Sequence, residues 1–196
     1  RTKLIGHKSG KLTITEPHDL ALVFLNGMFI DTVFRDGGNW TVDLPKTDVD
    51  NPVLDILVEG MGHINYGPYI VDRKGITERV LLNGMTLMEW DMYKLPFTAT
   101  YMQGITATAA YTETMGNFFK GSFTLKKTGD TYLDLSGYGK GMAWINGHHL
   151  GRFWNIGPQQ RLYCPASWLN EGANELVVFD LFGGKAAEVA GFGTQY

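Results

Sequence analysis

Cysteine and charge are both scarce in this chain of 196 residues. The single cysteine, Cys164, excludes an intramolecular disulfide and cannot form a metal site by itself. Charged residues make up 19% of the chain and the net charge is −3, so the sequence has no basic stripe to neutralise phosphates. Neither nucleic acid nor an anionic membrane is therefore expected as a partner, and no motif calls for a cofactor.

Long apolar runs and helical periodicity are also missing. The run from Leu20 to Leu25 has only six residues, far fewer than the ~18 of a membrane-spanning helix. No segment repeats its apolar residues every 3.6 positions over ten residues, so little helix is expected. Glycine, in contrast, is abundant at 25 of 196 residues, which fits many short strands joined by tight turns. The predicted fold class is all-β.

The most informative stretch runs from Gly139 to Pro165. Met142-Ala-Trp-Ile145 has the residue types that pack on a pleated sheet, and Asn146-Gly147 is a strong signal for a type I′ hairpin turn. Leu150 to Trp154 returns as a second strand, and Arg161 to Cys164 forms a third. In the third strand, Cys164 is expected to be a small buried hydrophobe.

An internal repeat determines the predicted domain count. Leu22-Val-Phe-Leu-Asn-Gly-x-x-Ile30 matches Met142-Ala-Trp-Ile-Asn-Gly-x-x-Leu150 at an offset of 120 residues. An alternating strand follows each hairpin, at residues 51–59 and 174–180, with their relative register open by one residue. The repeat predicts two tandem antiparallel β-sandwiches of the jelly-roll type, in domains 1–92 and 93–196.

The stretch from Lys140 to Pro165 resembles a known family. Its Lys-Gly-x-x-Trp-Ile-Asn-Gly-x-x-Leu-Gly-Arg-Phe-Trp-x-x-Gly-Pro-Gln pattern, followed by Leu-Tyr-x-Pro, is similar to the C-terminal β-domain of the family 35 β-galactosidases. The segment from Leu57 to Gly75, with Asn65-Tyr66-Gly67 inside it, is similar to their first β-domain. The resemblance implies a galactose-binding-domain-like fold. Two positions depart from the pattern: Gly60 replaces the usual Asn, and His63 replaces the usual Arg, which puts any ion pair at that position in doubt.

The activity that the resemblance implies is retaining hydrolysis of terminal β-linked galactose. Retaining glycosidases use two carboxyl groups about 5 Å apart, and in this family both belong to a (β/α)₈ barrel of roughly 250 residues. The chain is too short and too poor in helix for a barrel. We therefore expect a fragment of a longer enzyme that braces the barrel of the same parent chain, contributes to its pocket rim and is inactive alone. Glu59 is expected to bond loop backbone rather than to catalyse.

Tyr66 is the candidate substrate-binding residue. In the resembled enzymes, the tyrosine of the Asn-Tyr-Gly loop helps to line the galactose pocket, and a phenol offers a sugar both a hydrogen bond and a ring edge. A tyrosine that closes a turn by bonding backbone is the competing interpretation. The resemblance also favours a periplasmic, secreted or lysosomal location.

Two other functions stay open from the sequence. A free-standing carbohydrate-binding module is one, because sugars stack on aromatic rings and the second half is rich in them; core packing is the competing role for Trp144, Trp154, Trp168, Tyr138 and Phe153. A structural or assembly domain pair without a ligand is the other. The adjacent His148 and His149 point to opposite faces of a strand, so we expect exposed hairpin residues rather than a metal site.

Overall fold

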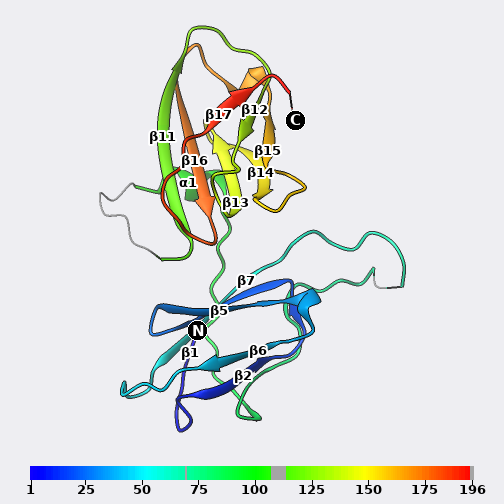
Figure 1. Ribbon diagram of the computed structural model, residues 1–196, viewed down its shortest axis with the longest axis vertical. Helices are drawn as coiled ribbons and strands as arrows, with labels where there is room; N and C mark the ends of the chain where they lie inside the picture. Colours follow the sequence, from blue (N-terminus) through cyan, green and yellow to red (C-terminus); the bar gives the residue numbers. More distant parts are fainter. Residues whose placement is uncertain (69, 107–113, 195–196) are drawn as a thin grey trace. The chain divides into compact units, whose positions relative to one another are not determined.

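The protein is almost entirely β-structure. The computed structural model describes residues 1–68, 70–106 and 114–194 (Figure 1). The chain divides into two compact units, Arg1–Lys94 and Leu95–Tyr196. The sequence repeat places the boundary between residues 92 and 93. Both units are built from antiparallel sheets, which confirms the predicted fold class.

The first unit contains two four-stranded sheets, with strand orders β1-β7-β4-β5 and β10-β9-β2-β6. A two-stranded sheet, β3-β8, lies beside them. The strands are β1 (Thr2–Lys3), β2 (Gly10–Ile14), β3 (Pro17–His18), β4 (Leu20–Leu25), β5 (Met28–Phe34), β6 (Thr41–Leu44), β7 (Val53–Glu59), β8 (Gly75–Ile76), β9 (Val80–Leu82) and β10 (Met85–Thr86), with a 3₁₀ turn at Arg35–Gly37.

The core of this unit comes from alternate residues of its two large sheets. Leu12 and Ile14 of β2 face inward and are fully buried, while Lys11 of the same strand is exposed. Because side chains alternate across a strand, this pattern places one face of β2 in the core and the other in water. On β4 both faces are covered, since Leu20 and Leu22 are buried as well. The same core includes Val23 of β4 and Leu54 of β7.

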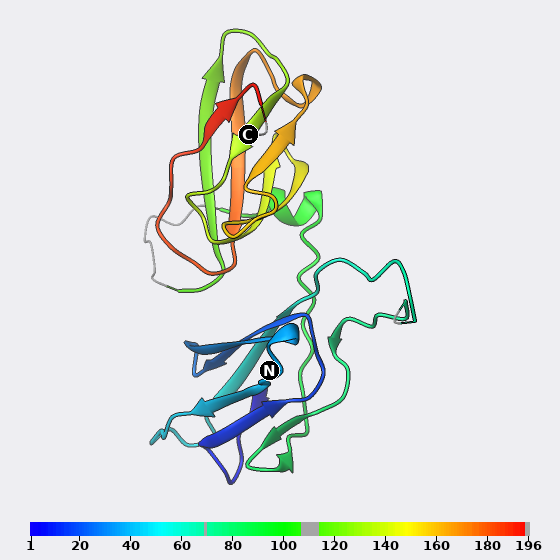
Figure 2. The ribbon, with the colours of Figure 1, turned by 45° about the vertical axis from the view of Figure 1, so that its right-hand side comes forward.

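The second unit repeats the plan with fewer strands. Its sheets have the orders β11-β16-β13-β14 and β15-β12-β17. The elements are α1 (Ala99–Gln103), β11 (Asn117–Leu125), β12 (Thr131–Asp134), β13 (Lys140–Ile145), β14 (His148–Trp154), β15 (Arg161–Cys164), a 3₁₀ turn at Ala166–Trp168, β16 (Gly172–Asp180) and β17 (Ala190–Phe192). Figure 2, turned from the first view, shows the long β11 and β16 running side by side.

The internal repeat is visible in the local geometry of both hairpins. Asn26-Gly27 and Asn146-Gly147 all have positive φ, at 51° and 78° in the first turn and 49° and 81° in the second, as a type I′ turn requires. Each hairpin also shifts register at the same place, between Val23 and Phe24 and between Ala143 and Trp144. The relative register of the two later strands, which the sequence leaves open, follows from their pairing with the hairpins. Leu25 pairs with Leu54 in the first unit, and Ile145 pairs with Leu176 in the second.

Three further details concern the strands and their flanking residues. Strand β10 has only two residues and ends at Thr86. Strand β4 starts at Leu20, and Asp19 is a buried carboxylate just before it. Cys164, as predicted, is fully buried, and burial raises the pKa of its thiol to about 11.

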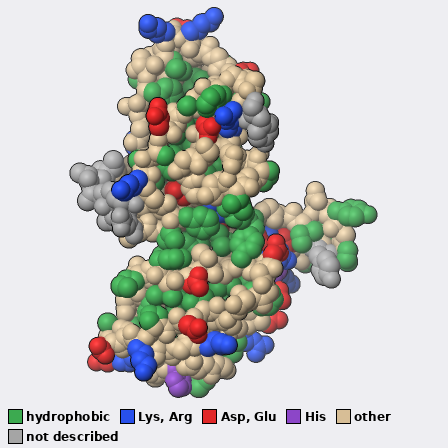
Figure 3. Space-filling view, in the orientation of Figure 1, with side chains coloured by type: hydrophobic (Ala, Val, Ile, Leu, Met, Phe, Trp, Pro, Cys, Tyr) green, Lys and Arg blue, Asp and Glu red, His purple; other side chains and the backbone are tan. Residues whose placement is uncertain are grey.

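Charge is spread thinly over the surface. On the face seen in Figure 3, acidic and basic side chains are interspersed among neutral ones. In the part of the chain that the structure describes, no helix has the length and apolar character needed to cross a bilayer.

Candidate functional site

The loop that carries Tyr66 leaves the first unit between β7 and β8. It starts after Glu59 and returns at Gly75, and both views show it extending away from the sheets of its unit (Figures 1 and 2). All of its described residues from 62 to 70 are exposed, so this part of the loop has no apolar core of its own. Its position must therefore be fixed by contacts at its base.

A cluster of buried charges lies at that base. The Lys74 ammonium is 2.7 Å from a carboxylate oxygen of Asp19 and 2.7 Å from one of Asp72. The Arg35 guanidinium nitrogen Nη1 lies 3.0 Å from Asp19 and 2.9 Å from Asp72 on the opposite oxygens. The two carboxylate side chains are 4% and 0% exposed, and two cations balance their two charges. Such a cluster is geometrically specific because each charge is buried only while its partners remain in place.

The same carboxylates hold the loop backbone. Met61 N–H donates to Asp19 Oδ2 at 2.7 Å, and Ile64 N–H donates to Asp72 Oδ2 at 3.2 Å. Asp72 itself belongs to the returning part of the loop, so it ties the outgoing and returning limbs together. We call Asp19, Asp72, Arg35 and Lys74 the charge cluster. The charge cluster fixes the backbone of Ile64, two residues before Tyr66, and the returning limb of the loop after Tyr66.

The electrostatics of the charge cluster favour its ionised state. The hydrogen bond from Lys74 is the main reason that the pKa of Asp72 is well below its usual range, and it outweighs burial. Burial alone would raise the pKa of Asp19, but hydrogen bonds from Lys74, Met61 N–H and Arg35 lower it instead. Burial opposes the charge of Lys74 too, yet its two carboxylate partners raise its pKa. All three pKa shifts favour the charged forms, so at neutral pH the cluster holds two carboxylates and two cations whose charges balance.

His18 extends the charge cluster on one side. Its Nδ1 lies 3.4 Å from Asp72 Oδ1, and its Nε2 lies 3.1 Å from Glu16 Oε2. The ring is buried in the short strand β3, which pairs with β8 directly after Lys74. His18 therefore packs against the returning limb of the loop.

Tyr66 lies in the exposed part of this loop. Its side chain is 88% exposed, which places the phenol in water rather than against the backbone of the turn. Asn65 and His63 are also exposed. The basic partners of the buried carboxylates are Arg35 and Lys74, so the change to His63 leaves the charge cluster complete. Tyr69 of the resembled segment lies outside the described residues.

The aromatic and histidine residues singled out in the second half take several roles. Trp144, Tyr138 and Phe153 are buried core residues. Lys140 lies over the Trp154 ring at 4.8 Å, and His148 stacks on Trp168 with a ring separation of 4.9 Å. His148 and His149 are exposed hairpin residues, as the sequence predicts. Among the residues that the structure describes, no group of His, Cys, Asp or Glu is arranged to hold a metal ion.

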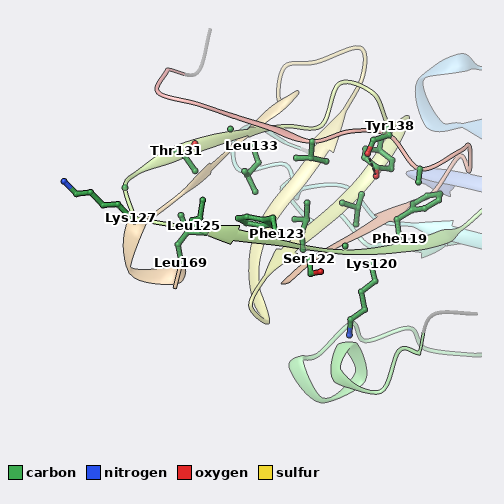
Figure 4. Close-up of a pocket in the computed structure, with 18 residues that line it drawn as sticks. Phe119, Lys120, Ser122, Phe123, Leu125, Lys127, Thr131, Leu133, Tyr138 and Leu169 are labelled. Atoms are coloured by element: carbon green, nitrogen blue, oxygen red, sulfur yellow. Dashed lines mark hydrogen bonds between the residues drawn. The ribbon is translucent and has the colours of Figure 1, made fainter. Parts of the chain in front are cut away.

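The second unit has a cavity of about 650 Å³ between its two sheets (Figure 4). Carbon atoms of Phe119, Phe123, Leu133 and Val178 form much of its wall, and the side chains of Lys120 and Lys127 point away from it. Thr131 and Tyr138 also line it, so its wall is mostly, but not wholly, apolar. The cavity is an open part of the sandwich core.

Sequence reasoning missed the charge cluster. Its four members come from Asp19, Arg35, Asp72 and Lys74, which belong to three separate segments of the chain. Asp19 stands at the head of an apolar run, and a charged residue at that place was a usable signal, because carboxylates are almost never fully buried without a partner. The partner residues could not be identified without the fold.

Together, the repeated strand order and the anchored loop define a tandem β-sandwich protein with one elaborated loop. The family described as "Beta-galactosidase, first all-beta domain" matches residues 1–96, and "Beta-galactosidase, galactose-binding domain" matches residues 117–174. The chain therefore belongs to the β-domains of the β-galactosidases.

Curated relatives agree with this assignment. "Beta-galactosidase 1" of Dictyostelium discoideum is 34% identical over 193 residues, covering 88% of this chain and 29% of the relative. "Beta-galactosidase-1-like protein 2" of Homo sapiens is 39% identical over 169 residues, covering 83% and 26%. "Beta-galactosidase" of Xanthomonas manihotis is 36% identical over 169 residues, covering 85% and 28%. The chain thus spans less than a third of the length of these relatives.

Proposed function

We propose that this chain forms the non-catalytic β-domains of a retaining β-galactosidase of glycoside hydrolase family 35. In this proposal the parent enzyme hydrolyses terminal β-linked galactose with two carboxyl groups of a separate (β/α)₈ barrel. The β-domains brace that barrel, and Tyr66 lines the rim of its galactose pocket. The family matches to both units and the Asn65-Tyr66-Gly67 motif support this assignment.

One observation carries the role of Tyr66. The residue is 88% exposed, although the loop backbone before it is tied to two buried carboxylates, one of which, Asp72, lies in the returning limb. A large, amphipathic ring gains nothing for its own domain when it is held out in water at the end of an anchored loop. A preorganised ring of this kind is suited to contact a substrate, because little conformational entropy is lost on binding.

The test uses the full-length parent enzyme. Tyr66→Phe should lower kcat/KM by a few-fold to roughly tenfold, because it removes one hydrogen bond of about 0.5–1.5 kcal/mol to a sugar hydroxyl. Tyr66→Ala should lower it further, since it also opens the pocket rim to water. The melting temperature should not change with Phe, because the hydroxyl serves the substrate.

Tyr93→Phe is the matched control, since Tyr93 is a 70% exposed tyrosine of the same unit outside the loop. Its kcat/KM should equal that of the wild type. A Tyr66→Phe enzyme with unchanged kinetics and a lowered melting temperature would mean that the hydroxyl closes the turn, and the pocket role would be lost.

A further inference from the structure

The outer face of the sheet β15-β12-β17 in the second unit carries a row of three aromatic rings. Tyr163 of β15 is paired with Tyr132 of β12, and Tyr132 is paired with Phe192 of β17. Tyr163 and Phe192 are 47% and 39% exposed, and the rings of the two tyrosines are 5.5 Å apart. Paired residues in neighbouring strands share a face, so the three rings lie on the same face of the sheet. We call these residues the aromatic row.

The first unit shows that the fold does not need this row. Its equivalent sheet pairs Lys11 with Asp43 at the positions that Tyr132 and Tyr163 occupy in the second unit. Asn83 follows β9 and donates its backbone N–H to Lys11 O, so it takes the place of Phe192. The same sheet position is therefore stable with polar side chains. The fold of the second unit therefore does not require three aromatic rings on this face.

A fixed arginine lies beside the row. Arg161 Nε donates to Asp134 Oδ2 at 2.9 Å, and the guanidinium carbon lies 4.0 Å above the centre of the Phe192 ring. Asp134 is itself held by Ser136 N–H at 3.0 Å. A guanidinium has five N–H donors, and one is committed to Asp134. Arg161 thus presents directed donors next to the two tyrosine rings, at low entropic cost.

The second tyrosine is also held in place. Tyr163 hydrogen-bonds Asp130, which is the first reason that the pKa of its phenol is raised. Asp130 in turn accepts from Ala166 N–H at 2.8 Å. A hollow of about 360 Å³ opens beside Tyr132, Tyr163 and Arg161, with Gln159 and Trp168 on its wall. That volume is near the lower end of the range of small-molecule sites, roughly 300–1,000 Å³.

We propose that the aromatic row and Arg161 form a binding site for a neutral oligosaccharide. The flat carbon faces of sugar rings can stack on Tyr132 and Tyr163, while Arg161 and the Gln159 amide donate to hydroxyl groups. The ligand is neutral because Asp134 already balances Arg161, and Asp130 adds a nearby negative charge that repels carboxylated or sulfated sugars. The site lies on the second unit and does not depend on the role proposed for Tyr66.

The test is a titration of the isotope-labelled 196-residue chain with β-linked galactotetraose, followed by NMR. We expect saturable shifts at Tyr132, Tyr163, Arg161 and the Trp168 indole, with a Kd of about 0.1–1 mM. Tyr163→Ala should weaken binding about three- to tenfold, the loss expected for one ring contact. Exchange of the pair to the residues of the first unit, Tyr132→Lys with Tyr163→Asp, should abolish binding while the fold is retained, as the spectrum and melting temperature will show.

Three controls determine whether the sugar binds at the aromatic row and whether its charge matters. Tyr101→Ala changes another partly exposed tyrosine of the same unit and should leave the Kd unchanged. Tyr93→Ala, at an exposed tyrosine of the first unit, should also leave it unchanged; shifts at residues 60–68 in place of the aromatic row would overturn the proposal. An oligogalacturonate of the same length should bind at least tenfold more weakly, on the order of 1.4 kcal/mol. Equal binding of the charged sugar, the absence of saturable binding by the wild-type chain at millimolar sugar, or retention of affinity in the exchanged pair would each refute a neutral-sugar site.

Discussion

The two units of this chain share a scaffold but place their special residues differently. In both, the central hairpin has an Asn-Gly turn and the same register shift, and the neighbouring long strand pairs in the same order. The first unit has a long excursion, residues 60–79, between β7 and β9, whereas the second has only residues 181–189 between β16 and β17. The second unit instead carries aromatic rings on the outer face of its smaller sheet.

The buried carboxylates of the two units also differ in their surroundings. Asp19 and Asp72 of the first unit are surrounded by cations, which lower their pKa values. Asp180 of the second unit is 1% exposed, and burial raises its pKa despite hydrogen bonds from the backbone of Gly139, Lys140 and Phe182. The first arrangement anchors a long loop with ion pairs, and the second closes a short one with backbone donors. The repeated strands supply stability to both units, and the loops and outer faces are free to diverge.

The largest difference in stability between the two units should appear when the charge cluster is broken. Asp19→Ala leaves Lys74 and Arg35 with one carboxylate for two positive charges at a largely buried position. We expect the first unit to lose about 3 kcal/mol of unfolding free energy, the usual cost of an unpaired buried charge. The second unit should melt as before. Asp48→Ala, at an exposed acid of the first unit, is the control and should change little; equal losses for both variants would show that the cluster adds no stability.

The second largest difference should come from the asparagines of the two turns, because they make different numbers of hydrogen bonds. Asn146 accepts from Glu175 N–H and donates to Trp168 O and to Asn174 Oδ1, whereas Asn26 accepts from Val53 N–H. At about 1 kcal/mol for each hydrogen bond, Asn146→Ala should destabilise its unit by roughly 2–3 kcal/mol and Asn26→Ala by about 1. Urea denaturation of each variant measures the two losses. If Asn26→Ala proves the more damaging change, the comparison of the turns is wrong.

The turn glycines should behave alike. A Cβ at Gly27 or Gly147 meets no atom within 4 Å, so the cost of a valine comes from positive φ alone. Gly27→Val and Gly147→Val should each cost about 1–2 kcal/mol, the penalty of a left-handed conformation for a residue with a Cβ. Thermal melts should show nearly equal shifts. An unchanged melting temperature for either variant would mean that its turn relaxes to another type.

Acid should change the stability of the two units in opposite directions, and this is the smallest of the expected effects. Asp19 and Asp72 have lowered pKa values, so their contribution is present above about 3.9 and is lost as the pH falls through the folded values. Asp180 has a raised pKa, so its buried charge costs stability at neutral pH and protonation relieves that cost. Circular dichroism melts at pH 7 and pH 3 test this. A first unit that tolerates acid better than the second would contradict it.

The scaffold could be predicted from sequence because its signals are local. Asn146-Gly147 and the alternation in Leu54 to Glu59 specify a turn and a half-buried strand within a few residues. The sites could not, because they join distant segments. Tyr132, Tyr163 and Phe192 meet only once three strands are paired, and nothing in their separate contexts indicates a shared face. Tyr66 could be singled out only because its motif resembles a family, whereas its anchoring by Asp19 and Asp72 required the fold.

Amide hydrogen exchange at Met61 and Ile64 tests most directly whether buried carboxylates hold the loop that presents Tyr66. Both amides donate to the charge cluster, so both should exchange slowly in the wild-type chain although the loop around them is exposed. Asp72→Ala should speed exchange at Ile64, while Asp48→Ala should alter neither amide. Fast exchange of both amides in the wild type, or rates that Asp72→Ala leaves unchanged, would contradict the account.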